Sequence, residues 1–256
     1  MKPLRYRIIL LILSLFAGIM HASSQDASAI LEKMDKIFYS PVDKQGKIAI
    51  ILTDKTGKEK IREAEMFQKG RDRKLYRYTK PESQAGVATL SLPNDVMWLY
   101  MPAFEKPKKI SNLAKKQSFT GTDFSYEDMA TTPYSERFTP DSLETEQDLY
   151  VVRLLPKSDN SAYSKVIVRI NKPYGYPVTM EFYNVRGKKI KEANYRYEKI
   201  GEYWNAADVV MKDLEKNHST RILLSDIKFD QGLPDDIFTV EKLNPAGTKK
   251  KNEGSN

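Results

Sequence analysis

The chain has 256 residues, of which 40% are hydrophobic and 30% charged, and its formal net charge is +8. It contains no cysteine and only two histidines, which excludes a disulfide scaffold, a thiol nucleophile, a cysteine-linked lipid anchor and a multi-histidine metal site. This balance is typical of a globular chain that buries a core, and not of a membrane bundle or a disordered chain.

Residues 1–24 have the pattern of a secretory signal peptide. Basic residues precede an apolar run, and small residues close the segment. We expect cleavage after Ser24, with cleavage after Ala22 as the alternative. The apolar run is shorter than the roughly 20 residues that a membrane-spanning helix needs, so an uncleaved anchor is disfavoured. The sequence therefore predicts an exported protein.

The mature chain opens with the clearest helical pattern in the sequence. In residues 26–39 the apolar side chains of Ile30, Met34 and Phe38 fall on one helical face, and Pro41 follows. The spacing predicts a helix that ends before this proline.

After this helix the hydrophobic period changes to two residues, which is typical of strands. Short turns rich in Gly, Asn and Asp separate the strands, so successive strands form an antiparallel meander. The predicted strands are Lys47–Asp54, Glu59–Lys69, Lys74–Thr79, Val87–Leu92, Val96–Met101, Leu149–Leu155, Lys165–Ile170, Val178–Tyr183, Lys189–Tyr197, Trp204–Asp213 and Thr220–Asp226.

The two faces of this predicted sheet differ, because one is apolar and aromatic and the other is charged. A large sheet with one apolar face must curl and be covered. We therefore predict a mainly β (α+β) fold, a curved antiparallel half-barrel of about eleven strands. The N-terminal helix and a short lid helix after Asp123 would cover its concave side. The interior is compatible with a packed core and with a ligand cavity.

The remaining segments set the domain organisation. Lys106–Lys116 and Thr131–Leu143 have no clear period, and we predict irregular connections there. Residues 245–256 form a predicted disordered basic tail, which leaves residues 25–244 as one domain. Lys and Arg alternate with acids along the chain instead of gathering on one helix, so we expect no nucleic-acid partner.

Motifs for catalysis or cofactor binding are missing from the sequence. Signal cleavage leaves His218 as the single histidine, in a context that predicts a solvent-exposed hairpin turn. The GxSxG elbow, GxGxxG, P-loop and HExxH patterns are absent. We expect no enzyme activity, no cofactor and no metal.

Four acids lie close together near the C-terminus, and their oxygens raise the alternative of a calcium site. Their spacing does not fit an EF-hand, and a loop entering a short turn with Pro234 at its first position explains them better. The four are Asp226, Asp230, Asp235 and Asp236.

One stretch, Ser118–Asp128 (SFTGTDFSYED), reads as a motif. Gly121 frees the backbone ahead of a short amphipathic element, with Ser125 and Asp128 spaced like a capping box. We expect Phe119 and Phe124 to point inward, and Glu127 and Asp128 to face water. A glycine in this position suits the hinge of a movable lid.

This stretch resembles a signature of the LolA-like superfamily of bacterial outer-membrane lipoprotein-sorting proteins, and Phe229–Thr239 (FDQGLPDDIFT) is a second, weaker match. The resemblance spans about residues 26–243. It implies a periplasmic protein whose incomplete barrel, lidded by helices, holds lipid or acyl chains. It also implies transfer partners, namely an inner-membrane transporter or an outer-membrane acceptor.

From this we expect a monomeric, non-enzymatic carrier or chaperone for lipoprotein acyl chains or another lipid. The alternatives are a sensor or partner-binding module with a filled interior, and a lipid hydrolase, which the single histidine disfavours. The lid hinge would be Gly121. The predicted lipid-binding residues of the cavity or lid are Trp98, Tyr100, Phe119, Phe124, Met129, Phe182, Tyr195 and Trp204.

Overall fold

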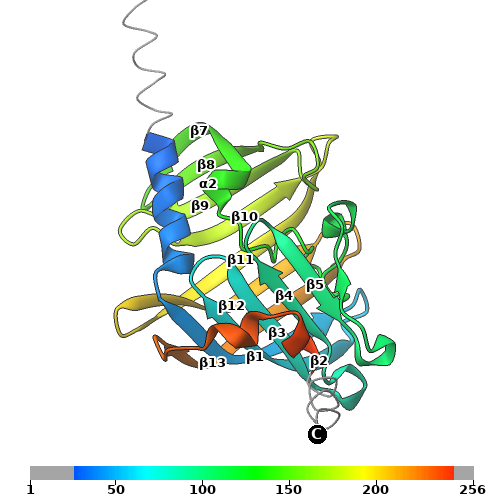
Figure 1. Cartoon of the computed structure of the whole chain (residues 1–256). Coiled ribbons are helices and arrows are strands. Elements are labelled where there is room, and N and C mark those ends of the chain that lie inside the picture. The colour runs from blue at the N-terminus through cyan, green and yellow to red at the C-terminus, as the bar shows by residue number, and fades with distance from the viewer. Residues whose placement is uncertain (1–25, 245–256) are drawn as a thin grey trace, which may run out of the picture.

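A computed structural model describes residues 26–244 of the chain (Figure 1). The predicted signal peptide and basic tail lie outside these residues. Residues 26–39 form the N-terminal helix, and α2 (Tyr134–Arg137) is a single turn. Across residues 26–244, no helix combines the length and the apolar character needed to cross a membrane.

The other described elements are strands and short 3-10 turns. The strands are β1 (Asp43–Thr53), β2 (Glu59–Lys69), β3 (Arg73–Lys80), β4 (Ala88–Leu92), β5 (Val96–Tyr100), β6 (Lys108–Lys109), β7 (Phe138–Glu146), β8 (Leu149–Pro156), β9 (Lys165–Asn171), β10 (Pro177–Tyr183), β11 (Lys189–Ile200), β12 (Tyr203–Asp213) and β13 (His218–Phe229). The 3-10 turns are η1 (Glu82–Gln84), η2 (Pro102–Phe104), η3 (Leu113–Lys116), η4 (Asp235–Phe238) and η5 (Glu241–Leu243).

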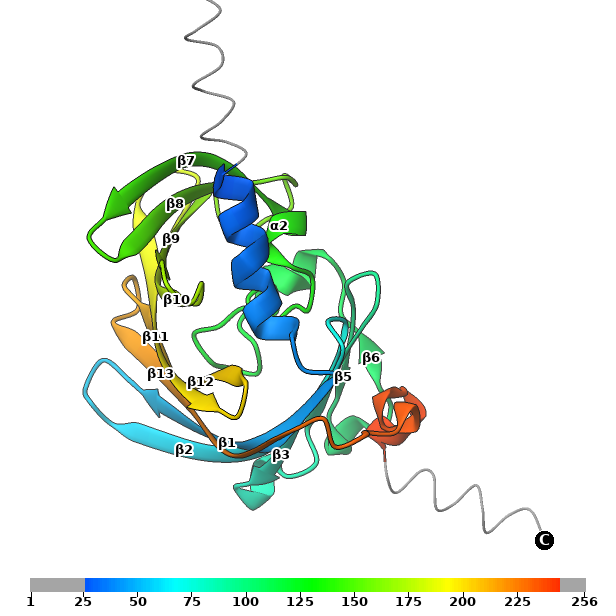
Figure 2. The ribbon, with the colours of Figure 1, turned by 90° about the vertical axis from the view of Figure 1, so that its left-hand side faces the viewer.

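All thirteen strands belong to one antiparallel sheet, in the order β6-β5-β4-β3-β2-β1-β13-β12-β11-β10-β9-β8-β7. The sheet stays open, with β6 and β7 at its two edges, and it curls into a half-barrel (Figure 2). The predicted curved antiparallel half-barrel is therefore confirmed, with thirteen strands where about eleven were predicted. The two additional strands are β6 and β7, which lie wholly or partly in segments predicted as irregular connections. Each of the predicted strands is present, with its ends shifted by a few residues at most.

The prediction was wrong for Phe138–Leu143, which was assigned to an irregular connection but belongs to β7. This strand is polar, and Pro140 interrupts its pattern at a point where the register shifts. A proline is tolerated there because β7 pairs on one side only and so needs half as many ladder hydrogen bonds.

The strand order explains how the chain covers its own concave side. From β1 in the middle of the sheet, the chain runs outward to the edge strand β6 and must then reach the opposite edge, β7. Residues 110–137, here called the crossing segment, make this connection through the space enclosed by the curved sheet (Figure 2). From β7 the strands return one by one to β13, which pairs with β1. The Ser118–Asp128 motif lies in the middle of the crossing segment.

The short lid helix is present but begins at Tyr134 and not directly after Asp123. The capping box does form, because the Ser125 amide donates to the Asp128 carboxylate at 2.7 Å and the Asp128 amide donates to the Ser125 hydroxyl at 3.1 Å. Only turns follow it, however. A backbone bridge between Ser118 and Ser125 folds the motif back on itself, which leaves no run of residues long enough for a helix.

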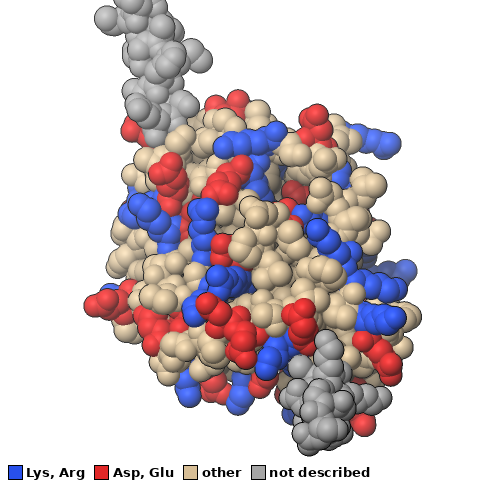
Figure 3. Space-filling view, viewed as in Figure 1, with Lys and Arg blue, Asp and Glu red and all other residues tan. Residues whose placement is uncertain are grey.

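Apolar side chains pack on both faces of the sheet. The larger cluster fills part of the concave side and contains Leu31 and Met34 of the N-terminal helix, both fully buried. A second cluster lies on the other face, where Leu233, Phe238 and Leu243 of the C-terminal segment cover β3, β4 and β5. On the face seen in Figure 3, basic and acidic side chains are interspersed, as their alternation in the sequence predicts.

Candidate functional site

The concave side contains a pocket of about 200 Å³ that the packed cluster leaves unfilled. Its floor is the middle of the sheet, and residues of the N-terminal helix and of the crossing segment line its opposite side. Figure 2 shows both of these segments on the concave side of the sheet. The sheet contributes Ile48, Ile50, Ala64, Met66, Tyr76 and Tyr78 from β1 to β3, and Tyr195, Tyr197, Trp204, Ala206, Val209, Ile222 and Leu224 from β11 to β13.

Strand register explains why these side chains share one face. Ile48 of β1 lies opposite Ala64 of β2, which lies opposite Tyr78 of β3, and Met66 lies opposite Tyr76. Side chains directly opposite one another on antiparallel strands point to the same face. The alternating residues of neighbouring strands therefore build a continuous and largely apolar wall.

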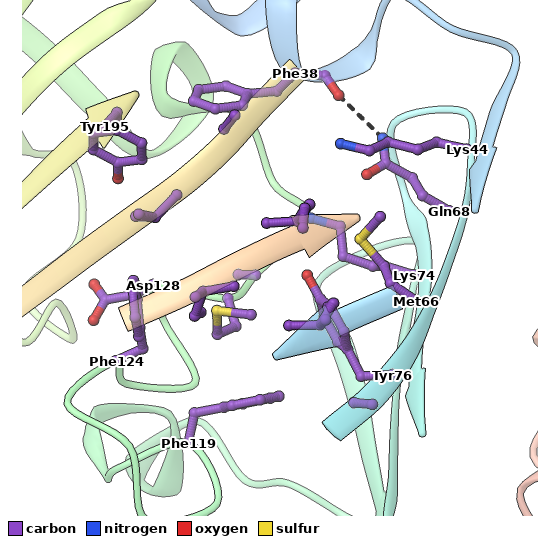
Figure 4. A pocket seen from close by; sticks show the side chains of 18 of the residues that line it. Phe38, Lys44, Met66, Gln68, Lys74, Tyr76, Phe119, Phe124, Asp128 and Tyr195 are labelled. Carbon is purple, nitrogen blue, oxygen red and sulfur yellow. Dashed lines mark hydrogen bonds between the residues drawn. The ribbon is translucent and has the colours of Figure 1, made fainter. Parts of the chain in front are cut away.

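The N-terminal helix is fastened over the pocket by hydrogen bonds at its C-terminal half. The buried Asp35 carboxylate accepts the backbone N–H groups of Tyr134 and Ser135, each at 2.9 Å, at the start of α2. Tyr39 donates its hydroxyl to the Thr131 carbonyl at 2.8 Å. The buried Gln68 side chain of β2 donates to the Phe38 carbonyl at 3.1 Å, which Figure 4 shows. Helix, crossing segment and sheet are thus joined above the pocket.

Asp35→Ala is expected to lower the free energy of unfolding by about 1.5–3 kcal/mol, because it leaves two buried N–H groups without their charged acceptor. Asp35→Asn keeps one acceptor oxygen and is expected to lose less. Urea unfolding of the two variants beside the unmodified protein checks this order. Equal stability of Asp35→Ala and the unmodified protein would contradict the role of this carboxylate as a fastening.

The acids of the motif are structural anchors, and the expectation that Glu127 and Asp128 face water was wrong. Glu127 accepts the Ser161 hydroxyl and the Ala162 amide, both at 2.7 Å, and Asp128 accepts the Tyr163 hydroxyl at 2.8 Å. These bonds attach the motif to the loop between β8 and β9. The two carboxylates point toward this loop and not into solvent, because its hydroxyl and amide groups supply their hydrogen-bond donors.

His218 is also not the free turn residue that its sequence context predicted. It begins β13, its side chain is 25% exposed, and its Nδ1 lies 2.7 Å from the carboxylate of the buried Asp123. The same carboxylate accepts the Thr220 hydroxyl at 2.6 Å. Asp123 is far from His218 in sequence, so only the folded sheet reveals this pair.

Five of the eight predicted lipid-binding residues line the pocket: Phe119, Phe124, Met129, Tyr195 and Trp204. Gly121 lies in the crossing segment beside them with a backbone φ of 81°, a conformation that favours glycine. Thr120 next to it is held by Arg62, which donates to its carbonyl at 2.6 Å. The role of Gly121 as a lid hinge stays a prediction.

The other three predicted residues lie outside the pocket. Trp98 and Tyr100 belong to the cluster on the opposite face of the sheet, whereas their neighbours Met97 and Leu99 pack into the concave side. A shift of one residue along a strand exchanges its two faces, and both faces of β5 are apolar. Phe182 does point to the concave side, but it is 2% exposed and packs on Tyr163, with ring centroids 4.7 Å apart.

Three cationic side chains line the pocket beside its apolar wall: Lys44, Lys74 and Arg137. Burial and, to a smaller extent, the charge of the neighbouring Lys74 together lower the pKa of Lys44 to about 7. Burial also lowers the pKa of Lys74 to about 8, with a smaller contribution from Arg137. The phenol groups remain neutral, since burial raises the pKa of Tyr134 to about 12 and that of Tyr195 well above its usual value.

The four C-terminal acids separate into individual contacts. Asp226 pairs with Lys47 and Asp235 with Lys69 and Arg73, and the partners of Asp230 and Asp236 are Tyr203 and Lys242. Among residues 26–244 no group of three or more His, Cys, Asp or Glu side chains is placed to share a metal ion. Pro234 is the N-cap of the short turn η4, one position earlier than predicted.

A family model with the description "uncharacterized protein" matches residues 70–245, more than half of the chain. No curated protein matches the chain.

Solved structures share its fold. A domain from Vibrio parahaemolyticus, provisionally described as an outer-membrane lipoprotein-sorting protein domain, has a TM-score of 0.79 at 25% identity and covers 86% of this chain and 99% of its own. A LolA superfamily protein from Nitrosomonas europaea has a TM-score of 0.69 at 25% identity, covering 85% and 97%. The chain belongs to the family of the model that matches residues 70–245, and this family is part of the LolA-like superfamily. A DUF1329 family protein from Desulfovibrio piger shares the LolA-like fold at 22% identity, with a TM-score of 0.81 and coverages of 86% and 99%.

Sequence reasoning missed the cationic residues of this LolA-like pocket, although a signal for them exists. Lys44 is in phase with the buried Ile48 and Ile50 of the same strand, and Lys74 is in phase with Tyr76 and Tyr78. A lysine in the inward phase of an alternating strand departs from the expected pattern. In a chain with 42 Lys and Arg residues, the two positions did not stand out.

Proposed function

We propose that this LolA-like protein is a non-catalytic periplasmic carrier that holds an acyl chain of a lipoprotein or of another lipid. The pocket supports this proposal most directly, because it is largely apolar, lies on the concave side of the sheet and is partly covered by the N-terminal helix and the crossing segment. In this proposal the signal peptide is removed and residues 25–244 act as one monomeric domain.

Apolar burial would supply the binding energy. Each CH₂ group taken out of water contributes about 0.8 kcal/mol, so a chain of ten buried methylenes gains about 8 kcal/mol before entropic losses. The pocket volume of about 200 Å³ is below the roughly 300–1,000 Å³ typical of sites for drug-sized ligands. We infer that it holds one short or partial acyl chain as it stands, and that a longer chain requires the crossing segment to move outward.

The N-terminal helix and the crossing segment together form the lid of the pocket, and a few hydrogen bonds hold this lid in place. Uptake and release would break the Asp35, Tyr39 and Gln68 bonds while the sheet stays intact, since strand pairing does not depend on them. An acceptor that binds the open form would draw the lipid out. An inner-membrane transporter and an outer-membrane acceptor are the partners that such a transfer requires.

Native mass spectrometry of residues 25–256, purified from a periplasm without detergent, tests the proposal. We expect a bound mass that organic solvent releases as lipid. A ligand-free protein that also fails to take up a fluorescent fatty acid would contradict the carrier proposal. It would favour the alternative, an envelope sensor or partner-binding module, which the well-packed remainder of the concave side also accommodates.

A further inference from the structure

The pocket has a polar end, and its charges are unbalanced. Lys44 of β1 lies directly opposite Gln68 of β2, and Gln68 lies directly opposite Lys74 of β3. The three side chains form one row across adjacent strands, so the Cα atoms of the two lysines are only about 10 Å apart. The rows beside it, such as Met66 and Tyr76, are apolar. Cationic and apolar lining thus occupy different parts of one pocket.

The lysine row lacks a carboxylate of its own within the described chain. The Lys74 side chain forms no ion pair or hydrogen bond with another residue of the range 26–244, and the charged groups that act on it are Lys44 and Arg137. Lys44 donates to the Asn205 side chain at 2.6 Å, and Asn205 donates in turn to Glu198 at 3.2 Å. The charge of Glu198 raises the pKa of Lys44, but this effect is smaller than the lowering by burial and by Lys74.

Arg137 approaches the pocket from the lid. Its guanidinium stacks on the Tyr134 ring at 4.5 Å and donates to the Glu127 carbonyl, while its Nε is buried without a partner in the described chain. The carboxylate of Asp128 also lines the pocket, but Figure 4 shows it across the pocket from the lysines. Asp128 already binds Ser125 and Tyr163 and lies 3.6 Å from Lys191.

Half-buried cations that repel one another and have no carboxylate beside them cost stability, and an anion placed among them recovers it. We propose that the lipid of this pocket is a single-chain amphiphile with an anionic head group, a carboxylate or a phosphate, held by Lys44 and Lys74. Its acyl chain would lie along the apolar rows toward Tyr78 and Phe119. This rests on the proposed function, and it adds that the cargo is selected by charge as well as by its apolar chain.

Binding of the delipidated protein to dodecanoate and to its neutral methyl ester tests the inference at pH 7. We expect dodecanoate to bind at least tenfold more tightly than the ester. Lys74→Met removes the charge with little change of volume. It is expected to weaken dodecanoate binding about tenfold and to leave the ester within about twofold, whereas Lys74→Arg retains dodecanoate. Lys60→Met, on an exposed part of β2, is the matched control and should leave both ligands unchanged.

The pH dependence gives a second readout. The ammonium forms attract the anion, and Lys44 and Lys74 lose their protons as the pH rises through about 7 and about 8. Dodecanoate affinity is therefore expected to fall between pH 7 and pH 9.5, by up to about tenfold per pH unit for each proton that binding must take up. The affinity of the methyl ester should stay constant over this range.

The possible outcomes separate the two proposals. Equal binding of dodecanoate and ester, unchanged by Lys74→Met, would overturn the head-group inference and leave the lipid carrier intact. Binding of neither ligand would overturn the carrier proposal itself. Dodecyl phosphate distinguishes the two anionic sources, because a preference for it over dodecanoate indicates a phospholipid-type head group and the reverse indicates a fatty acid. The unfolding midpoint of Lys74→Met shows that the variant is folded, and we expect it to equal or exceed that of the unmodified protein.

Discussion

Ala206→Trp is expected to abolish uptake of a fluorescent fatty acid, with at least a tenfold loss of affinity. Ala206 lies on β12, where its small side chain leaves room in the pocket, and it pairs with Tyr197 of β11. An indole ring at this position would occupy much of the roughly 200 Å³ that an acyl chain would use. Filling an existing cavity is far less costly than overpacking a dense core, which destabilises by about 1–3 kcal/mol.

Val185→Trp is the control for this experiment. Val185 is 89% exposed in the turn between β10 and β11, so the same substitution there adds bulk without touching the pocket. Fluorescence titration of both folded variants gives the comparison. If Ala206→Trp bound the fatty acid as tightly as Val185→Trp, the lipid would have to lie elsewhere, and the pocket would lose its proposed role.

Phe182→Ala is expected to lower the free energy of unfolding by about 3–5 kcal/mol, with little direct effect on ligand contacts. Phe182 is 2% exposed, packs against Tyr163, and is not part of the pocket lining. Removing a buried aromatic ring loses its transfer free energy and leaves a cavity behind. A charged replacement such as Phe182→Asp would therefore report on folding and not on lipid retention.

Urea unfolding measures this loss, and Phe104→Ala provides the comparison. Phe104 is 55% exposed in η2, and substitutions at such positions usually change stability by less than about 0.5 kcal/mol. A Phe182→Ala protein as stable as Phe104→Ala, but with weakened lipid binding, would place Phe182 in the binding site after all.

Much of the fold could be predicted because strand alternation and turn residues are local properties of the sequence. Glu59–Lys69 was predicted with the bounds that the structure has, since Gly57 and Gly70 mark the turns on either side. The N-terminal helix was predicted from its apolar spacing in the same way. The edge strand β7 was missed because Pro140 disturbs its pattern, and an edge tolerates this where a central strand would not.

The candidate site was predicted less completely, because membership of a pocket depends on which of two faces a residue takes. For Phe119 and Phe124 the motif itself placed the side chains, and both line the pocket. For Trp98 and Tyr100 the sequence did not indicate which face of β5 points into the concave side, because both faces are apolar. The C-terminal segment buries the opposite face as well. The local sequence of a strand does not indicate that a segment more than a hundred residues further along the chain will cover it.

The sequence by itself determined the antiparallel meander, the helix over residues 26–39 and the presence of the Ser118–Asp128 motif. Only the tertiary structure decided which side chains line the pocket on the concave side and how its charges are arranged. It brought Lys44 and Lys74 into one row through the register of three strands, and it joined Asp123 of the crossing segment to His218 of β13. Periodicity is encoded in neighbouring residues, whereas charge balance in a pocket arises from residues that meet only when the sheet has formed.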